Sequence, residues 1–440
     1  MILLFPTFAQ EEGEPDKEEL TSVREDRIRT LKYGIDDEVV AIITAIQNEK
    51  DETYNDVLID ILNRSGNSKI KTQIISFFET QEDNAAEDFA LNVLKMSTED
   101  YDVDEKVLTA VISYCGTLKL ESSAEFLYQL SDNKSKTISA SAIRNLGKTG
   151  VTTNAEKFLE RIQDEDFEDD EDELRESVIL LLGELKYKPA VLTLMDIAQD
   201  DGYSSVARRY ACDSLGKIGD EQAIPVLKEL LNDSDSILRS YAISSLAYFD
   251  TNEIEDILIQ ALRDSFWRIR VAAAKALSER KSTSAVDILI YKAEKDPEAN
   301  VKKAAMEALA VIGNNTALSF LSDYYQDNKN SDAFRSTAIT VLLKENAGKA
   351  VDAMKVVFEE EWEKDSSWLL NYTCKELSTT ENASLRWFYE KMLDHKNYII
   401  NIYAVRGIRL NNIISLYGRV RDIAEDESKH QTLRKEAASL

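Results

Sequence analysis

Apolar and basic side chains recur along this chain in one fixed order. An apolar residue is followed by a basic one, then two or three residues, an Ala, three residues and a final Leu. Five segments show the order most clearly, at 206–216, 237–247, 268–277, 301–309 and 334–342. The small residue stands four positions before the final apolar one, so both lie on one face of an α-helix. Each segment therefore predicts an amphipathic helix.

The final apolar residue of each segment, called the landmark here, can be followed along the whole chain. The landmarks are Ile46, Phe78, Cys115, Leu146, Leu182, Leu215, Leu246, Leu277, Leu309, Leu342, Leu377 and Ile408. Successive landmarks are 31 to 37 residues apart. Such a period is typical of helix pairs that stack side by side. The chain is predicted to be all-α, an α-solenoid (α-α superhelix) of about twelve helix pairs from about residue 20 to residue 425.

A second amphipathic segment lies between successive landmark helices and is clearest at 223–231. Pro225 fits the first turn of this helix, where its missing N–H costs nothing, and Pro189 has the same place in an earlier repeat. Asp233 and Asp235 follow, and both are good caps for the next landmark helix.

The block Leu-Gly-Lys-Ile-Gly-Asp-Glu-Gln-Ala-Ile-Pro-Val-Leu at 215–227 resembles the HEAT-repeat family, and its bacterial form is similar to phycobilisome-lyase repeats. Weaker copies occur at 146–150, 182–185 and 309–313. The resemblance implies a curved right-handed superhelix in which the second helices line the concave face. It implies a scaffold and no single activity.

The repeat pattern divides the chain into four stretches. These are a signal-peptide-like, acidic N-terminus at 1–19, degenerate repeats at 20–133, clear repeats at 134–345, and degenerate aromatic-rich repeats with a cap at 346–440. Thr7-Phe8-Ala9 places small residues where a signal peptidase cleaves, although the apolar start is short and lacks a basic flank. A truncated signal peptide predicts an exported, periplasmic or extracellular protein, and the alternative is a ragged cytoplasmic terminus.

Charge and composition narrow the classes of partner. The net charge is −28, from 53 basic and 81 acidic residues. Such a surface repels nucleic acid and anionic lipid, and the apolar runs are too short to span a membrane. A protein partner is therefore expected, with the oligomeric state left open. Cys115, Cys212 and Cys374 lack metal-site spacing and are expected in the core.

Catalytic patterns are missing from the sequence. It has two histidines, His395 and His430, and no HExxH, GxSxG, P-loop or GxGxxG motif. We therefore expect no enzyme activity, no catalytic residue, no metal site and no cofactor. The acidic run at 164–173 lacks the spacing of a Ca²⁺-binding EF-hand loop. It is expected to be a solvated loop, with a bound cation or basic partner as the alternative.

Basic residues seven positions before the landmark form a ladder. Its members are Lys71, Arg175, Arg208, Arg239, Arg270, Lys302 and Arg335. HEAT-like repeats use this position to pair with acidic residues of the turns, which here implies partners such as Asp233, Asp264 and Asp296. The alternative is a basic strip for an anionic ligand.

Partner-binding residues are expected on the concave face, at positions six and two before the landmark. Arg209, Lys275, Lys303 and, in an earlier repeat, Arg144 occupy such positions. Trp267 and Arg268 begin the helix of Leu277, and an exposed Trp beside Arg is typical of a binding hot spot. The alternative is that Trp267 packs on the neighbouring repeat.

Aromatic residues crowd the C-terminal quarter. They are Trp362, Trp368, Trp387, Phe388, Tyr389, Tyr398, Tyr403 and Tyr417. They are expected either to dock a partner or to close the core at the end of the solenoid. The function predicted from all these features is a protein-interaction scaffold or adaptor. The alternatives are a bilin-lyase-like enzyme subunit and a non-binding structural spacer of the cell envelope.

Small-angle scattering tests the predicted architecture. If neighbouring helix pairs step about 10 Å along the axis, as helix packing distances indicate, the particle approaches about 120 Å in length. A compact, spherical scattering profile would contradict the solenoid.

Overall fold

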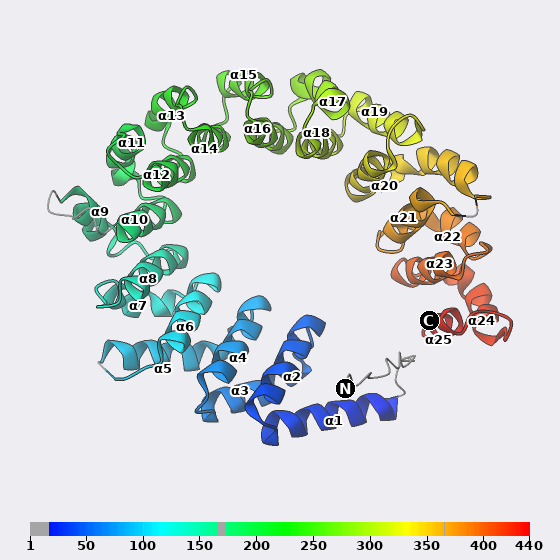
Figure 1. Ribbon diagram of the computed structural model, residues 1–440, viewed down its shortest axis with the longest axis horizontal. Coiled ribbons are helices and arrows are strands. Elements are labelled where there is room, and N and C mark those ends of the chain that lie inside the picture. Colours follow the sequence, from blue (N-terminus) through cyan, green and yellow to red (C-terminus); the bar gives the residue numbers. More distant parts are fainter. Residues whose placement is uncertain (1–16, 100, 165–171, 365) are drawn as a thin grey trace, which may run out of the picture. The chain divides into compact units, whose positions relative to one another are not determined.

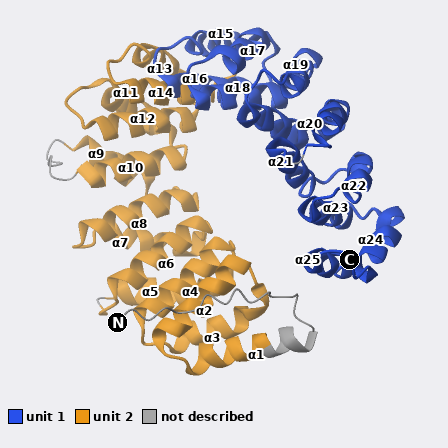
Figure 2. Ribbon diagram, turned by 45° about the vertical axis from the view of Figure 1, so that its right-hand side comes forward, with its two compact units in different colours: residues 1–15, 251–440 blue, residues 16–250 orange. Residues whose placement is uncertain are grey.

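The computed structural model describes residues 17–99, 101–164, 172–364 and 366–440 (Figure 1). Within these residues the chain forms 25 α-helices joined by turns and short 3-10 segments, and no strand. The helices divide between two compact units, which are called unit 2 for residues 16–250 and unit 1 for residues 251–440 (Figure 2).

The helices of unit 2 alternate between two layers. The landmark layer contains α2 (Asp36–Glu49), α4 (Ser68–Thr80), α6 (Glu105–Thr117), α8 (Lys136–Thr149), α10 (Asp172–Glu184), α12 (Ser205–Ile218) and α14 (Ser236–Leu246). The connecting layer contains α1 (Lys17–Tyr33), α3 (Asn55–Arg64), α5 (Glu87–Thr98), α7 (Ala124–Leu130), α9 (Ala155–Gln163), α11 (Val191–Gln199) and α13 (Ile224–Leu230). Successive landmark helices pack on one another, on the inner side of this unit's bend (Figure 1).

Unit 1 repeats the arrangement. Its landmark layer contains α16 (Trp267–Glu279), α18 (Ala299–Ile312), the first part of α20 (Asp332–Glu361), α21 (Trp368–Leu377), α23 (Tyr398–Leu410) and α25 (Gln431–Ala438). Its connecting layer contains α15 (Asn252–Ala261), α17 (Val286–Lys295), α19 (Asn315–Gln326), the second part of α20, α22 (Arg386–Met392) and α24 (Tyr417–Glu425). Helix α20 serves both layers because Asn346, with φ −148° and ψ 50°, interrupts its helical backbone.

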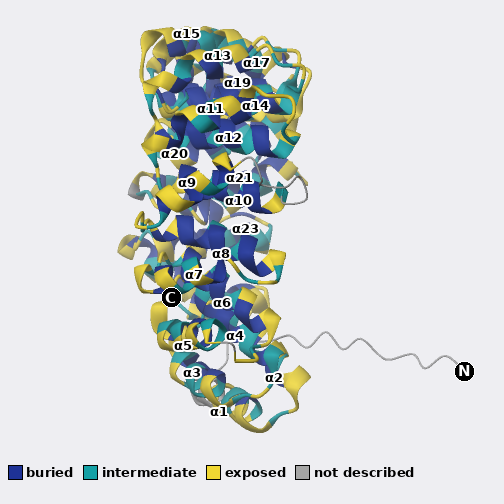
Figure 3. Cartoon of the chain, turned by 90° about the vertical axis from the view of Figure 1, so that its left-hand side faces the viewer, coloured by how far each residue is buried: buried dark blue, intermediate teal, exposed yellow. Residues whose placement is uncertain are grey.

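The twelve landmarks confirm the predicted all-α solenoid. All of them lie in helices of the landmark layer, and the most exposed, Leu146, keeps only 3% of its surface accessible. Figure 3 shows buried residues along the middle of the stacked pairs and exposed residues at helix ends and turns. Pro225 and Pro189 lie in first turns as expected, and Asp235 caps α14 by accepting the N–H of Ile237.

The series of landmarks read from the sequence missed one landmark helix, α25, because the helix pairs continue beyond residue 425. In α25, the Arg434 Nε donates to the carbonyl of Ala424, ten residues earlier. Arg208 donates to Ala198 over the same separation, so Arg434 holds the basic position of a further repeat. The landmark of that repeat would stand one position past Leu440, and the ladder therefore stopped at Ile408.

Glycines hold four successive landmark helices close together. Gly116, Gly147, Gly183 and Gly216 each directly follow a landmark. A Cβ on Gly147 would lie 2.8 Å from the Cα of Leu181 on the next landmark helix, and one on Gly216 would lie 2.7 Å from the Cα of Ser245. The backbones can approach this closely because no side chain separates them.

The close approach brings hydrogen bonds between helices. The Ser214 hydroxyl donates to the carbonyl of Ile179 at 2.9 Å, and the Ser245 hydroxyl donates to that of Cys212 at 2.8 Å. Helices with Gly, Ala and Ser at their contact pack closer than helices with large side chains there. Because the small residues belong to the landmark layer, that layer forms the inner side of the bend. The expectation that the second helices line the concave face is therefore wrong, since these connecting helices lie on the outer side.

The basic ladder is structural, as the family resemblance implied. Arg208 donates to Asp233 at 2.7 Å, and Arg270 donates twice to Asp296, at 2.9 and 2.6 Å. Arg208 and Arg270 both lie on landmark helices, and each residue is at least nine-tenths buried. Each ties its helix to the turn that leads into the next landmark helix, so the ladder does not form a ligand strip.

Two sequence predictions fall on segments outside the described residues. The signal-peptide-like start lies within 1–16, and most of the acidic run lies within 165–171. None of the helices in the described part of the chain combines the length and apolar content needed to cross a lipid bilayer.

Replacing glycine at two helical positions tests the close packing. Gly216→Ala should lower the free energy of unfolding by about 1–3 kcal/mol, because the added methyl group overpacks the contact with Ser245. Gly348→Ala is the control, since nothing lies within 4 Å of a Cβ there. It should gain up to about 1 kcal/mol from helix propensity alone. Urea unfolding followed by circular dichroism measures both, and equal gains at the two sites would contradict the packing.

Acid titration tests the buried Arg270–Asp296 pair. Burial alone would raise the pKa of Asp296, but hydrogen bonds from Arg270, the Glu298 N–H and Lys292 lower it below its ordinary value. Asp296 therefore stabilises the fold above the unfolded pKa of about 4, and this contribution is lost as the pH falls through the lower folded value.

The Asp296→Ala variant should cost about 3–5 kcal/mol near pH 7, because the buried Arg270 loses its carboxylate partner and keeps only the carbonyls of Asp264 and Ser265. The difference from the parent chain should shrink as the pH is lowered below about 4. Urea midpoints measured at several pH values give this difference. A cost that does not change with pH would show that the carboxylate charge contributes nothing.

Candidate functional site

The helical register determines which side chains face the inner side of each landmark helix. Positions nine, six, five and two before the landmark lie opposite the buried landmark itself. On α16 these positions hold Arg268, Val271, Ala272 and Lys275; on α21 they hold Trp368, Asn371, Tyr372 and Lys375. In both helices the first and last of the four are exposed and the middle two are half-buried. The inner face of unit 1 is defined here as these four positions on α16, α18, α20, α21 and α23.

Positive charge collects on the inner face of unit 1. Its exposed charged side chains are Arg268, Lys275, Lys303, Glu307, Lys375 and Arg406. Five are basic and one is acidic, in a chain whose net charge is −28. The same positions on the landmark helices of unit 2 hold four basic and four acidic residues. The positive excess is therefore a property of unit 1.

Four of the five predicted partner-binding residues lie together in unit 1. Trp267 is half-buried at the start of α16, and the Arg268 guanidinium carbon lies 5.3 Å from the centre of its ring. This cation–π contact holds the exposed Arg268 along the Trp. Lys275 lies two turns further along, and Lys303 lies on α18, which packs on α16. Lys275 approaches Glu279 only to 3.9 Å in an exposed pair, which contributes little.

The fifth predicted residue, Arg209, lies in unit 2 and is paired within the chain. Its guanidinium donates to Asp235 at 2.9 and 2.6 Å. Burial alone would raise the pKa of Asp235, but Arg209 and the Ile237 N–H lower it below its ordinary value. Because Asp235 is the cap of α14, Arg209 joins α12 to the start of the next landmark helix.

The hollow that lies beside Trp368 was not predicted from the sequence. It has a volume of about 510 Å³, and the four inner-face residues of α21 contribute to its wall. Trp368 is 55% exposed and stacks on Tyr372, with ring centroids 5.2 Å apart and an interplanar angle of 27°. The hydroxyls of Tyr372 and Thr340 form a 3.0 Å hydrogen bond that ties the stack to α20.

The floor and rim of this hollow differ in polarity. Leu370 and Ile400 are buried and line it from α21 and α23. Lys375 and Lys364 stand at its rim, and Lys364 pairs with Glu361 at 2.6 Å. Lys375 is exposed and forms no ion pair within the residues that the structure describes. The buried His395 and the polar Ser367, Asn371 and Asn397 also line the hollow. The hollow thus combines two buried apolar side chains, an aromatic wall, several polar groups and a cation without an ion pair among the described residues.

The other C-terminal aromatics mainly close the core. Phe388 and Tyr389 are fully buried, and Trp362 and Trp387 pack around Phe358 with ring centroids 5.6 and 6.3 Å away. The expectation that aromatic rings close the core therefore holds for these four residues, and docking of a partner stays a prediction. Trp368 and Tyr398 are exposed at the surface.

His395 is buried against this aromatic cluster. Its ring packs edge-on against Trp362 with centroids 4.7 Å apart, and its Nδ1 accepts the N–H of Asn397 at 3.0 Å. Burial lowers the pKa of His395 below its ordinary value. The imidazole is therefore neutral near pH 7, and the Nδ1 contact leaves the proton on Nε2.

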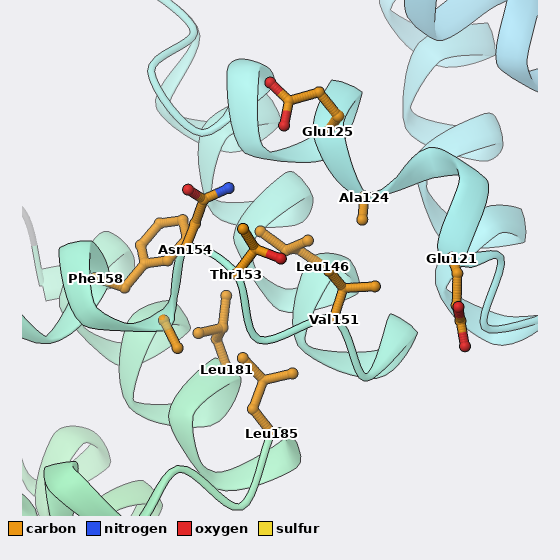
Figure 4. Close-up of a pocket in the computed structure, with 11 residues that line it drawn as sticks. Glu121, Ala124, Glu125, Leu146, Val151, Thr153, Asn154, Phe158, Leu181 and Leu185 are labelled. Atoms are coloured by element: carbon orange, nitrogen blue, oxygen red, sulfur yellow. The ribbon is translucent and has the colours of Figure 1, made fainter.

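A second hollow, in unit 2, has a different character. Its volume is about 240 Å³, with Leu146, Leu181 and Val151 inside and Glu121 and Glu125 at its edge (Figure 4). None of its lining residues occupies an inner-face position. It is a gap in the packing between helix pairs, and its acidic edge carries no group to hold an anion.

The cysteines lie in the core, as expected. Cys115, Cys212 and Cys374 are buried free thiols, and burial raises the pKa of Cys115 and of Cys212 to about 12. Both groups are therefore protonated near neutral pH. Within the described residues, no three His, Cys, Asp or Glu side chains are grouped to hold a metal ion.

Comparison with known proteins confirms the resemblance seen at 215–227. A family model described as spirochaete HEAT repeat protein matches residues 31–440. Among curated proteins, no sequence matches the chain.

Several solved structures are similar to this chain at low sequence identity. The phycocyanin lyase complex of CpcE and CpcF from Nostoc sp. PCC7120 is 18% identical, with a TM-score of 0.36, over 54% of this chain and 94% of that one. Kap121p is 12% identical, with a TM-score of 0.40, over 97% of this chain and 54% of that one. Kap95p, in a structure with RanGDP, is 14% identical, with a TM-score of 0.43, over 98% and 62%. At these identities, the likenesses concern the fold alone.

Proposed function

We propose that this chain, which belongs to the family of spirochaete HEAT repeat proteins, is a scaffold that binds a protein partner along the inner face of unit 1. One observation carries the proposal. The exposed charges of this face are five basic and one acidic, although the whole chain has a net charge of −28. The buried arginines of the ladder are neutralised within the chain, whereas Lys303 and Lys375 have no ion-pair partner among the described residues.

A protein partner fits this face better than a nucleic acid or a lipid surface. The basic side chains are spread over several helices, with Ala, Ser, Thr and Tyr between them. A long polyanion would also meet the repulsive field of the rest of the acidic chain. A limited acidic surface on a protein can pair with the few exposed cations and contact the apolar and hydroxyl side chains between them.

The N-terminal pattern supports a further proposal about location. The small residues at Thr7 and Ala9 support export, so the partner is expected in the periplasmic or extracellular fraction. The alternative is a cytoplasmic partner, and cell fractionation separates the two.

Affinity purification of the tagged full-length chain from its native host tests the scaffold. Exported and cytosolic fractions are analysed separately by mass spectrometry. One dominant protein should co-purify in stoichiometric amount. The variant combining Trp267→Ala and Arg268→Ala should reduce its recovery by about tenfold or more with unchanged helicity, because the pair has the character of a hot spot.

A charge-reversal set separates the inner face from net charge. Arg268→Glu, Lys275→Glu and Lys303→Glu together should abolish capture. Lys281→Glu, Lys295→Glu and Lys329→Glu together, which change the net charge equally at exposed positions off the inner face, should leave it intact. Unfolding of the Trp267 variant would place that residue in the core. If the tagged chain purifies without a partner, a structural spacer is favoured. If the purified chain is coloured by a bound pigment, a bilin-lyase-like subunit is favoured.

A further inference from the structure

We propose that the hollow beside Trp368 receives an aromatic side chain from an extended acidic segment of the partner. This inference rests on the proposed scaffold function and specifies which chemistry the partner presents. It adds an anchor point to a face that is otherwise recognised by charge. The chemistry of the occupant follows from the residues that form the wall, the floor and the rim of the hollow.

The wall of the hollow is an aromatic surface held ready for contact. Trp368 exposes 55% of its surface, an unusual amount for so large an apolar side chain. It does not move freely, because it stacks on Tyr372, and Tyr372 is hydrogen-bonded to Thr340 at 3.0 Å. Ser367 fixes the start of the helix by accepting the N–H of Leu370 at 3.0 Å. A partner ring would stack on a surface whose ordering cost is already met by the fold.

The size and floor of the hollow fit a large apolar side chain. Its volume of about 510 Å³ lies within the range of about 300–1,000 Å³ that is usual for ligand pockets. Leu370 and Ile400 supply an apolar floor at its base. Burying a ring there would remove apolar surface of both partners from water, which is the main source of hot-spot energy.

The rim of the hollow indicates acidic neighbours for that ring. Lys375 lies one turn from Tyr372 on the same helix face, exposed and without an ion-pair partner in the described residues. Of the other exposed cations of the inner face, Lys303, Lys275 and Arg268 lie on landmark helices earlier in the same unit. Arg406 lies on α23 and pairs with Glu436 at 2.9 Å. Because helices pack about 8–10 Å apart, a segment that reaches from the hollow to α16 crosses several helices and must be extended.

Trp368 occupies the same register position in its repeat as Arg268 does in the repeat of Leu277. The two residues are therefore equivalent positions on one repeated face. A partner segment that follows this face would meet cations on α16 and α18 and the aromatic hollow on α21.

Three synthetic peptides of twelve residues, labelled with fluorescein, test the inference on the full-length chain. The first alternates Glu and Ser around one central Phe, the second has Ala in place of Phe, and the third has Gln in place of every Glu. Anisotropy should show the acidic Phe peptide binding about tenfold or more tightly than the Ala peptide, the gain expected from burying one Phe ring. The Gln peptide should bind weakly, and salt should weaken the acidic peptides.

Matched variants connect the difference between peptides to the hollow. Trp368→Ala should bring the affinity of the Phe peptide to that of the Ala peptide, and Trp368→Tyr should restore most of the difference. Tyr291→Ala is the control, because Tyr291 is an aromatic residue 60% exposed on the connecting helix α17. Lys375→Glu should weaken both acidic peptides and leave the ratio between Phe and Ala unchanged. Circular dichroism verifies that each variant is folded.

The outcomes separate this inference from the function on which it rests. Equal affinities of the Phe and Ala peptides, or an equal effect of Tyr291→Ala and Trp368→Ala, would overturn the aromatic anchor. If capture of a partner still depends on Arg268, Lys275 and Lys303, the scaffold proposal stands alone. A chain dimer that Trp368→Ala dissociates, measured by sedimentation, would make a second copy the occupant and overturn the acidic-segment proposal. Loss of both capture and peptide discrimination would reject both.

Discussion

The contact between successive landmark helices determines the rest of this structure. In unit 2 the backbones meet at Gly147, Gly183 and Gly216, and Gly116 meets the Asn145 side chain; at all four, even a methyl group would collide with the next helix. The serine hydroxyls that bond across these contacts reach neighbouring carbonyls only because the helices are so close. A layer packed through small residues is shorter than a layer packed through large ones. The bend of the unit and the existence of an inner face both follow from this difference.

Two sets of basic side chains share the landmark helices and differ in what neutralises them. The set seven positions before the landmark points into the stack, and Arg208 and Arg270 pair there with Asp233 and Asp296. The set on the opposite side faces away from the connecting layer. Some of its members, such as Arg209, are paired, but Lys303 and Lys375 form no ion pair within the described residues. In a chain this acidic, cations that remain unpaired are notable. The distinction between a structural and a binding cation is therefore a matter of helix face, because the residue types are the same.

The sequence predicted part of the candidate site because helical register is a local property. Lys275 and Lys303 were placed correctly on an exposed face by counting from the landmark. Arg209 was counted in the same way, but its partner Asp235 belongs to the next turn, and an ion pair between repeats is not visible in periodicity. Trp368 was noted only as one of several C-terminal aromatics, although its register position equals that of Arg268. The count from the landmark had used positions six and two, whereas Trp368 lies nine positions before Leu377.

The sequence alone determined the period, the two amphipathic helices of each repeat, the buried landmarks and the capping and proline positions, since all of these depend on residues within a few turns of one another. Only the tertiary structure decided that α20 bends at Asn346 and that α25 adds a further landmark helix. It also decided that the hollow beside Trp368 has a floor contributed by α21 and α23. A hollow needs surfaces from several helices at once, and packing between repeats, which no local pattern encodes, brings those surfaces together.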